Sequence, residues 1–350
     1  MADFIEKISS EKEDEYEKVT IYKIANYPAD YTLQGLYDKD NNNEILIPPF
    51  QRKFVWSLSQ ASKLIESFLL GLPVPSIFLY KEKKSQKLLV IDGQQRLKSI
   101  FGYFSGTFPG TRKSFYLKNV NTKWEKKRFV DLDDSDQRRL KDSVLRAIIV
   151  EQLDPEDNTS IFHIFQRLNT GGTILRPQEI RNCIYQGKFN DLLHELNKNE
   201  TWRKIIGLSN PDNRMRDIEL ILRFLALYYE YKGYKKPMRD FLSKFMAKYK
   251  NEEGKIEDFK KIFIDTIGTM HQNLDSRLFR KKSGLNVAIF DSVMVAFAQH
   301  LNKIPPDIQS RYRRLLQSEQ YLEYVSKSTT DEKVVKERIR LAIEILFEQR

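Results

Sequence analysis

The first part of the chain is organised around residues 88–104, LLVIDGQQRLKSIFGYF. The run from Lys87 to Ile91 is almost wholly apolar, which predicts a buried strand. Five polar or glycine residues, Asp92 to Arg96, follow without a break. Apolar residues then recur at the spacing of one helix face: Leu97, Ile100, Phe101 and Phe104. The stretch therefore predicts a strand, a tight turn at Gly93 and a helix.

The sequence on the N-terminal side of this stretch predicts a hairpin and a helix. Ser76 to Tyr80 has strand character, and the polar loop from Lys81 to Gln86 is short enough for a hairpin to the next strand. The helix before it has a capping serine, Ser57 or Ser59, and ends at Gly71. Its buried face is predicted from the spacing of five residues: Ala61, Leu64, Ile65, Phe68 and Leu69.

Three further strands are predicted in the first part of the chain. Val19 to Ile24 alternates apolar and polar residues, and Glu44 to Ile47 is a short strand stopped by Pro48-Pro49. Val144 to Val150 is the third. The charged run from Asp131 to Lys141 lacks the glycine and terminal glutamate of a calcium loop, so we interpret it as a solvated helix start.

The pattern becomes helical from about Asp154 onward. Pro177 can occupy the first turn of a helix that carries Ile180, Cys183 and Ile184. Other stretches have helical patterns: 161–168, 218–231, 241–249, 256–270, 287–301 and 334–347. We therefore predict an α+β fold in two domains, residues 1–152 with strands and helices, and residues 153–350 all α-helical.

Composition excludes several protein classes. The chain has 350 residues, of which 41% are hydrophobic and 31% charged, so a largely disordered chain is excluded. The longest apolar stretches are too short to span a bilayer, and the first ten residues do not have the pattern of a secretory signal. With a single cysteine, Cys183, no intramolecular disulfide is possible. A cytoplasmic protein with no membrane partner is expected.

The net charge of +11 is unevenly distributed. The first 50 residues carry 5 Lys and 11 Asp or Glu, whereas the remainder carries 54 basic and 37 acidic residues. A basic body favours polyanions such as nucleic acid, nucleotides or an anionic membrane surface. Solubility alone is the other interpretation, because the basic residues are scattered and form no long tail.

The Asp92–Arg96 turn has the residue types of an anion site. Backbone N–H groups at the start of a helix attract anions, and Gly93 permits close approach of a phosphate. Arg96 can bind a phosphate bidentately, Gln94 and Gln95 can add amide donors, and Asp92 can hold a divalent cation or orient water. The alternative is a helix start flanked by surface polar residues.

Two other stretches combine polar residues with tight backbone geometry. Ile47 to Ser57, IPPFQRKFVWS, contains Gln51 and Arg52, and Arg52 can meet Arg96 around one polyanion. Its aromatic residues either stack on a base or pack under the next helix. Phe165 to Gly172, FQRLNTGG, contains Asn169 and Gly171 in a glycine-rich helix end. By spacing alone this last stretch is an ordinary helix C-cap.

Common catalytic and metal motifs are missing from the sequence. The four histidines form no H-E-x-x-H motif, one cysteine excludes a cysteine-rich zinc site, and P-loop, dinucleotide and nucleophile-elbow motifs are absent. His163 lies beside an apolar helical stripe and Cys183 on an apolar helix face, so both are interpreted as structural.

Taken together and in this order, the three stretches resemble the N-terminal half of GmrSD modification-dependent restriction enzymes. The segments that match are IPPFQRKFVWS, VIDGQQRLKSI and FQRLNTGG, with weaker similarity over about residues 15–300. The resemblance implies a ParB/sulfiredoxin-like N-terminal domain followed by an α-helical domain. It also implies nucleoside-triphosphate binding and hydrolysis in DNA restriction or anti-phage defence. Asp92, Gln94, Gln95 and Arg96 match the nucleotide-site motif, and Gln51-Arg52 matches a second polar motif.

The residues after 300 have no histidine and do not resemble the HNH nuclease domain of the restriction enzymes. We therefore expect a nucleotide-dependent sensor or regulator that cuts DNA only with a partner. Its partners would be modified or phage DNA and a nuclease or other defence protein, and a homo-oligomer stays open. Two alternatives are a non-enzymatic DNA- or protein-binding module with an anion cradle, and a phosphodiesterase or nickase.

The expected ligands are a nucleoside triphosphate and Mg²⁺. In this hypothesis Asp92 holds the metal ion, and Asp92, Gln95 and Arg96 are catalytic. The residues expected to bind the nucleotide are Gln51, Arg52, Gly93, Gln94, Asn169 and Gly171.

Overall fold

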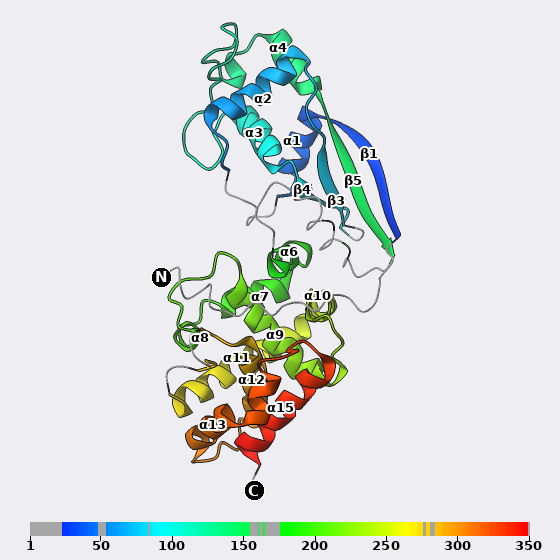
Figure 1. Cartoon of the computed structure of the whole chain (residues 1–350). Helices are drawn as coiled ribbons and strands as arrows, with labels where there is room; N and C mark the ends of the chain where they lie inside the picture. Colours follow the sequence, from blue (N-terminus) through cyan, green and yellow to red (C-terminus); the bar gives the residue numbers. More distant parts are fainter. Residues whose placement is uncertain are drawn as a thin grey trace. The chain divides into compact units, whose positions relative to one another are not determined.

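The structure is a computed structural model, and it describes residues 23–47, 54–82, 85–154, 160, 164, 176–275, 278–280 and 284–348. Its contacts divide the chain into two compact units (Figure 1). One unit is Thr20–Cys183, and the described part of the other begins at Ile184. The first is a mixed α/β structure and the second is helical, so the coarse α+β prediction is confirmed.

A five-stranded mixed sheet forms the centre of the first unit. The strands lie in the order β1-β5-β3-β4-β2. The β1–β5 and β3–β4 pairs are antiparallel, whereas β3–β5 and β2–β4 are parallel. The bounds are β1 Lys23–Thr32, β2 Ile45–Leu46, β3 Ile77–Lys81, β4 Leu88–Asp92 and β5 Val144–Asp154.

The hairpin predicted from the sequence is confirmed by the antiparallel pairing of β3 with β4. Leu79 faces Val90 in this pair, and Glu82 N–H donates to the Lys87 carbonyl at 3.0 Å where the hairpin closes. The short strand before Pro48 is confirmed as β2, which runs parallel to β4 with Ile45 opposite Leu88. Two strands that lead toward polar motifs are therefore neighbours in the sheet.

The strand at the edge of the sheet differs from the prediction. We expected Val19 to Ile24, but β1 begins at Lys23 among the described residues and continues to Thr32. Its sequence does not alternate clearly, and Pro28 stands in its middle. Pairing with β5 over ten positions holds it extended, and Arg146 and Asp30 form a bidentate ion pair across the two strands at 2.8 and 3.0 Å.

Four α-helices pack with the sheet. They are α1 (Leu33–Asn41), α2 (Leu58–Leu70), α3 (Gln94–Ser105) and α4 (Asp134–Asp142), with a 3-10 turn η2 (Phe129–Asp131) before α4. The predicted caps of α2 are confirmed: Ser57 and Gln60 form a capping box, and Gly71 ends the helix at φ +72°. All five residues of its predicted stripe are buried.

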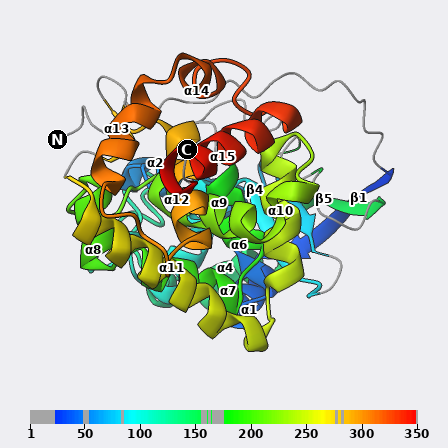
Figure 2. The same cartoon turned by 90° about the horizontal axis from the view of Figure 1, so that it is seen from below.

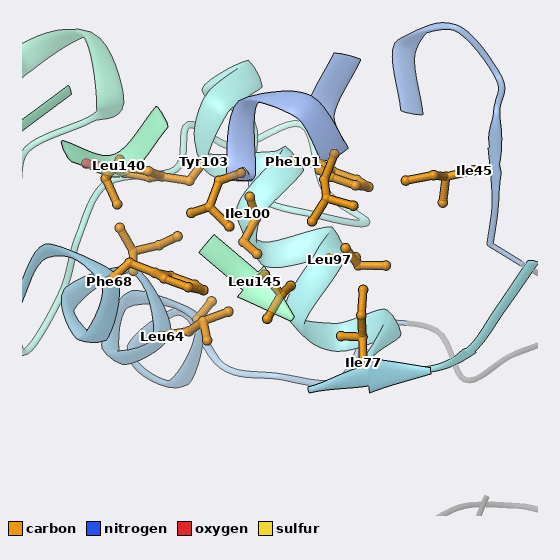
Figure 3. Packing of buried hydrophobic residues seen from close by; sticks show 14 of the residues in the cluster. Ile45, Leu64, Phe68, Ile77, Leu97, Ile100, Phe101, Tyr103, Leu140 and Leu145 are labelled. Carbon is orange, nitrogen blue, oxygen red and sulfur yellow. The ribbon is translucent and has the colours of Figure 1, made fainter. Parts of the chain in front are cut away.

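The core of this unit forms where α2 and α3 meet the sheet. Figure 3 shows Leu64 of α2, Leu97 of α3, Ile77 of β3 and Leu145 of β5 gathered in one cluster. Burial of each such side chain contributes about 1.5–3 kcal/mol. The apolar face of α3 therefore fixes the position of the helix start, where the polar turn lies.

Helix α4 is less solvated than the charged sequence predicts. Asp136 is buried and accepts a hydrogen bond from Trp124 Nε1 at 2.8 Å, and Lys123 Nζ lies 2.7 Å from the same carboxylate oxygen. Leu140 is fully buried on the same helix. Asp136 therefore fastens the loop before α4 to the unit, which the residue order alone does not reveal.

The regular elements that the structure describes in the second unit are helices, apart from one isolated bridge between Arg280 and Leu285. Helix α6 (Pro177–Ile184) leads into it, and the predicted Pro177 start is confirmed. The other helices are α7 (Lys188–Leu196), α8 (Glu200–Ile206), α9 (Arg216–Glu230), α10 (Met238–Tyr249), α11 (Glu253–Asn273), α12 (Val287–Gln299), α13 (Ile308–Gln317), α14 (Glu319–Tyr324) and α15 (Glu332–Phe347), with a 3-10 turn η3 (Tyr231–Gly233).

Helix α12 is the central helix of this second unit. It packs against α9, α11 and α15, as the view in Figure 2 shows, and its residues from Val287 to Ala298 are all buried. Asp291 on α12 accepts hydrogen bonds from two buried arginines, Arg223 of α9 at 2.6 Å and Arg338 of α15 at 2.7 Å. One carboxylate therefore holds three helices together.

Candidate functional site

The turn between β4 and α3 requires a glycine. Gly93 has φ +101°, a conformation that L side chains rarely adopt. A Cβ built on Gly93 would lie 2.2 Å from Ile77 Cγ2 on the neighbouring strand, which is a severe clash. The glycine therefore brings the start of α3 close against β3, immediately after Asp92.

The start of α3 has the donors that attract an anion. Gly93 has no side chain that could cap the helix, and the first intrahelical bond runs from Leu97 N–H to the Gly93 carbonyl at 2.9 Å. The N–H groups of the first helical turn consequently have no acceptor within the helix. Together with the helix dipole they make this end electropositive.

Arg96 is held in place by two contacts within the unit. Its Nη2 donates to Asp92 Oδ2 at 2.7 Å, and its Nη1 donates to the Pro75 carbonyl at 3.2 Å. The Arg96 side chain is 15% exposed and that of Asp92 is 46% exposed. A guanidinium has five N–H donors, so these two bonds leave capacity to bind a further anion. Asp92 remains accessible to solvent on the outer side of the pair.

Gln95 connects the turn to a distant segment. Its Oε1 accepts hydrogen bonds from the backbone N–H groups of Val55 at 3.0 Å and Trp56 at 3.3 Å. The Phe54 ring meets Phe108 edge-on with ring centroids 5.3 Å apart, and Phe54 and Trp56 both pack against the core cluster. The packing interpretation of these two aromatic residues is therefore the one that the structure supports.

The neighbouring face of α3 contains residues of a different character. Gln94 is buried, with 7% of its surface exposed, and Lys98 lies one helical turn further on, partly buried. Burial lowers the pKa of the Lys98 ammonium, and the opposite charge of Asp40 on α1 counteracts this effect. Burial likewise raises the pKa of Asp40, with Lys98 acting against it. Nothing in the order of residues indicated this pair, because Asp40 and Lys98 lie far apart in the chain.

The structure brings five of the expected site residues together at one turn, Asp92 to Arg96. The other four expected residues, Gln51, Arg52, Asn169 and Gly171, lie outside the described residues. The parallel pairing of β2 with β4 and the contact of Val55 with Gln95 place both described flanks of residues 48–53 beside the turn. That Gln51 and Arg52 reach the turn themselves stays a prediction.

Other candidate chemistry is limited in the part of the chain that the structure describes. These residues contain no group of three or more His, Cys, Asp or Glu side chains that could hold a metal ion. Cys183 is buried, and burial raises the pKa of its thiol well above the usual range, so the interpretation as a core residue is confirmed. His163 lies outside the described residues.

No helix among the described residues is both long and apolar enough to cross a membrane.

Comparison with known proteins shows what the first unit is similar to. Residues 33–186 match the family model described as GmrSD restriction endonuclease, N-terminal domain. This span is shorter than the similarity expected from the sequence, but it contains all three motifs and the whole β4–α3 turn. A search of curated proteins finds no match. The match over residues 33–186 confirms the resemblance inferred from the motifs.

Proposed function

We propose that the first unit binds a nucleoside triphosphate at the β4–α3 turn and hydrolyses it slowly, as a sensor or regulator in DNA restriction or defence. The observation that carries the proposal is the electropositive start of α3, where Arg96 and Asp92 form an ion pair within the GmrSD-type domain. The mixed sheet and its glycine turn agree with a ParB/sulfiredoxin-like fold, which is part of the proposal.

Each residue of the turn has a separate task in this proposal. The N–H groups of the first turn of α3 and the Arg96 guanidinium bind phosphate oxygens, and Gly93 allows the close approach. Asp92, with its carboxylate half exposed beside Arg96, orients a water molecule for attack in line with the leaving phosphate. Gln95 holds Val55 and Trp56, and its amide nitrogen is available for a phosphate oxygen.

The chemistry of the turn fits a metal ion that arrives with the nucleotide. Asp92 is the only carboxylate of the segment from Asp92 to Arg96, and one carboxylate plus phosphate oxygens is a usual ligand set for Mg²⁺. The ion would neutralise phosphate charge when bound. We include Gln51 and Arg52 as nucleotide ligands in the proposal because their described flanks lie at the turn. Asn169 and Gly171 belong to it by the resemblance of their motif.

Phosphate release from ATP, GTP, CTP and UTP with Mg²⁺ tests the proposal, with nucleotide binding measured in parallel. We expect Asp92→Ala to abolish hydrolysis and to leave the fold intact. The matched control is Asp30→Ala, which also removes an exposed aspartate from an aspartate–arginine pair, on β1. The proposal is wrong if no nucleotide binds, or if Asp92→Ala and the wild type release phosphate at the same rate.

DNA is the proposed second partner, because the chain after residue 50 is strongly basic and the matching family consists of restriction enzymes. A sensor requires that nucleotide and DNA affect one another. If hydrolysis does not respond to any DNA, modified or unmodified, a nucleotide switch that acts on a protein partner becomes the better account. If DNA binds and no nucleotide does, the first unit is a non-enzymatic binding module.

A further inference from the structure

The loop between α3 and α4 concentrates positive charge. Residues 106–128 contain seven lysines and arginines and one acidic residue, Glu125. Three of the seven are paired with aspartates on the following segment: Lys123 with Asp136, Lys127 with Asp133 and Arg128 with Asp131. The sequence shows seven cations in this loop, but the structure neutralises nearly half of them.

The four remaining cations of the loop are exposed. Among the residues that the structure describes, none of the four has an ion-pair partner: Arg112, Lys113, Lys118 and Lys126. The nearby carboxylates have other contacts. Glu125 accepts from Val120 N–H at 3.0 Å, and Glu66 pairs with Lys63 and accepts from Asn121 N–H. With Tyr116, which is 41% exposed, these four cations are called the basic loop surface below.

The backbone of this loop is ordered by hydrogen bonds. Thr107 and Ser114 form an antiparallel bridge, which closes the turn that carries Arg112 and Lys113. Exposure alternates along the next residues, because Phe115 and Leu117 are fully buried while Tyr116 and Lys118 are exposed. Tyr116 and Lys118 therefore lie on the same exposed side of this segment.

Backbone hydrogen bonds fix the segments that carry Lys118 and Lys126. Lys118 N–H donates to Ser62 Oγ of α2 at 2.9 Å. Leu117 exchanges hydrogen bonds with the opposite segment, accepting from Lys126 N–H at 2.8 Å and donating to the Lys127 carbonyl at 2.9 Å. A surface whose backbone is already ordered loses less conformational entropy when a rigid polyanion binds.

Lys126 has a backbone conformation that lysine rarely adopts. Its φ is +63°, a left-handed position where glycine and asparagine are favoured. Asparagine adopts this conformation at a lower cost than lysine. An asparagine can therefore replace Lys126 without added backbone strain.

We propose that the basic loop surface binds the phosphate backbone of duplex DNA. The proposed function names DNA as a partner, and this proposal assigns the surface that contacts it. Its biological meaning rests on the proposed function. Tyr116 is 41% exposed, and the hydroxyl of a tyrosine can donate a hydrogen bond to a phosphate. Four unpaired cations supply the salt-dependent part of the affinity.

The surface and the nucleotide turn share no residue. The surface begins after Gly106, which ends α3, whereas the turn lies at the start of this helix. DNA binding is measured without nucleotide and nucleotide hydrolysis without DNA, so that failure of the surface and failure of the nucleotide site are distinguishable.

The experiment measures the anisotropy of a labelled 20-base-pair duplex with the full chain, without nucleotide, over a range of salt concentrations. We expect the pair Lys118→Gln and Lys126→Gln to weaken binding at least about tenfold at 0.1 M salt and to lower the slope of log K against log salt by about 1.8. The matched control carries the same change of charge on exposed lysines of the second unit, Lys232→Gln with Lys303→Gln, and should change binding far less.

Two single variants separate lost binding from a lost fold. Lys126→Asn suits the left-handed backbone, so it should keep or raise the melting temperature and still weaken binding severalfold. Tyr116→Phe should weaken binding by loss of its hydroxyl alone. Equal losses in the control pair, unchanged binding in the Lys118 and Lys126 pair, or tighter binding to a single strand than to the duplex would each overturn the proposal.

Discussion

Arg96 donates a hydrogen bond to Asp92, four residues earlier, at 2.7 Å across the start of α3. The two residues belong to different elements, since Asp92 ends β4 and Arg96 lies in the first turn of the helix. The pair therefore joins sheet to helix at the point where the helix dipole is most positive. An incoming phosphate would meet a guanidinium that already has a fixed position, and a carboxylate that is already oriented by it.

We expect Arg96→Ala to weaken nucleotide binding by about 1.5–3 kcal/mol, the usual value of a hydrogen bond to a charged group. The change in folding stability should be smaller, because the ion pair with Asp92 is partly exposed. Calorimetric titration measures the first quantity and urea unfolding the second. Arg146→Ala, which breaks the exposed pair with Asp30, is the control and should leave nucleotide affinity unchanged. Equal affinities of wild type and Arg96→Ala would remove Arg96 from the site.

Replacement of Gly93 should be far more damaging than replacement of a glycine in open space. We expect Gly93→Ala to lower the free energy of unfolding by about 2–6 kcal/mol, because the new Cβ is strained at φ +101° and meets Ile77. Gly110→Ala is the control, since Gly110 also has positive φ, at +74°, but no atom within 4 Å of the new Cβ. Urea unfolding measures the loss of stability in both variants. Equal losses would show that backbone strain, and not the contact with Ile77, causes the loss in Gly93→Ala.

Gln95 should act as a structural connection to residues 55 and 56. Gln95→Ala leaves the N–H groups of Val55 and Trp56 without their acceptor, at a cost of about 1–3 kcal/mol. Gln95→Glu keeps an acceptor oxygen and should recover most of that stability. Hydrogen exchange at Val55 and Trp56 reads the connection directly, and protection that survives in Gln95→Ala would contradict it.

Asp136 should make the first unit sensitive to acid. Burial by itself raises the pKa of this carboxyl, but hydrogen bonds from Lys123 and Trp124 outweigh it and hold the pKa below 3.8. A lowered pKa in the folded state stabilises the fold above pH 3.8, and this stabilisation is lost as the pH falls further. We expect Asp136→Asn to be less stable at pH 6 and to lose less stability between pH 4 and pH 2. Urea midpoints at several pH values measure it, and parallel curves for the two proteins would contradict the assignment.

Asp291, the buried carboxylate of the second unit, should contribute more to folding stability than an ion pair on the surface. Asp291→Asn leaves Arg223 and Arg338 buried without their counter-ion, and we expect a loss of about 3–5 kcal/mol. Glu344→Gln breaks an exposed pair with Arg340 and should cost at most about 0.5 kcal/mol. Thermal unfolding distinguishes the two. A small effect of Asp291→Asn would mean that the arginines find other acceptors.

Local sequence patterns determined the elements that surround the candidate site. The period of apolar residues predicted α2 and α3, the capping serine and Gly71 predicted where α2 begins and ends, and Asp92 to Arg96 was correctly placed between strand and helix. These features depend on residues within about one helical turn or one strand of each other, so they can be derived from the order of residues.

Tertiary structure alone decided the features that join distant segments. The length of β1 depends on β5, more than a hundred residues away, and Arg96 is fixed by a carbonyl at Pro75. Gln95 was expected to serve a ligand, but its oxygen holds Val55 and Trp56. In the basic loop the sequence shows the cations but not which of them the aspartates neutralise. Charge pairing and strand order depend on distances between segments that are far apart in the chain. The packed core sets these distances, and local sequence patterns do not reveal them.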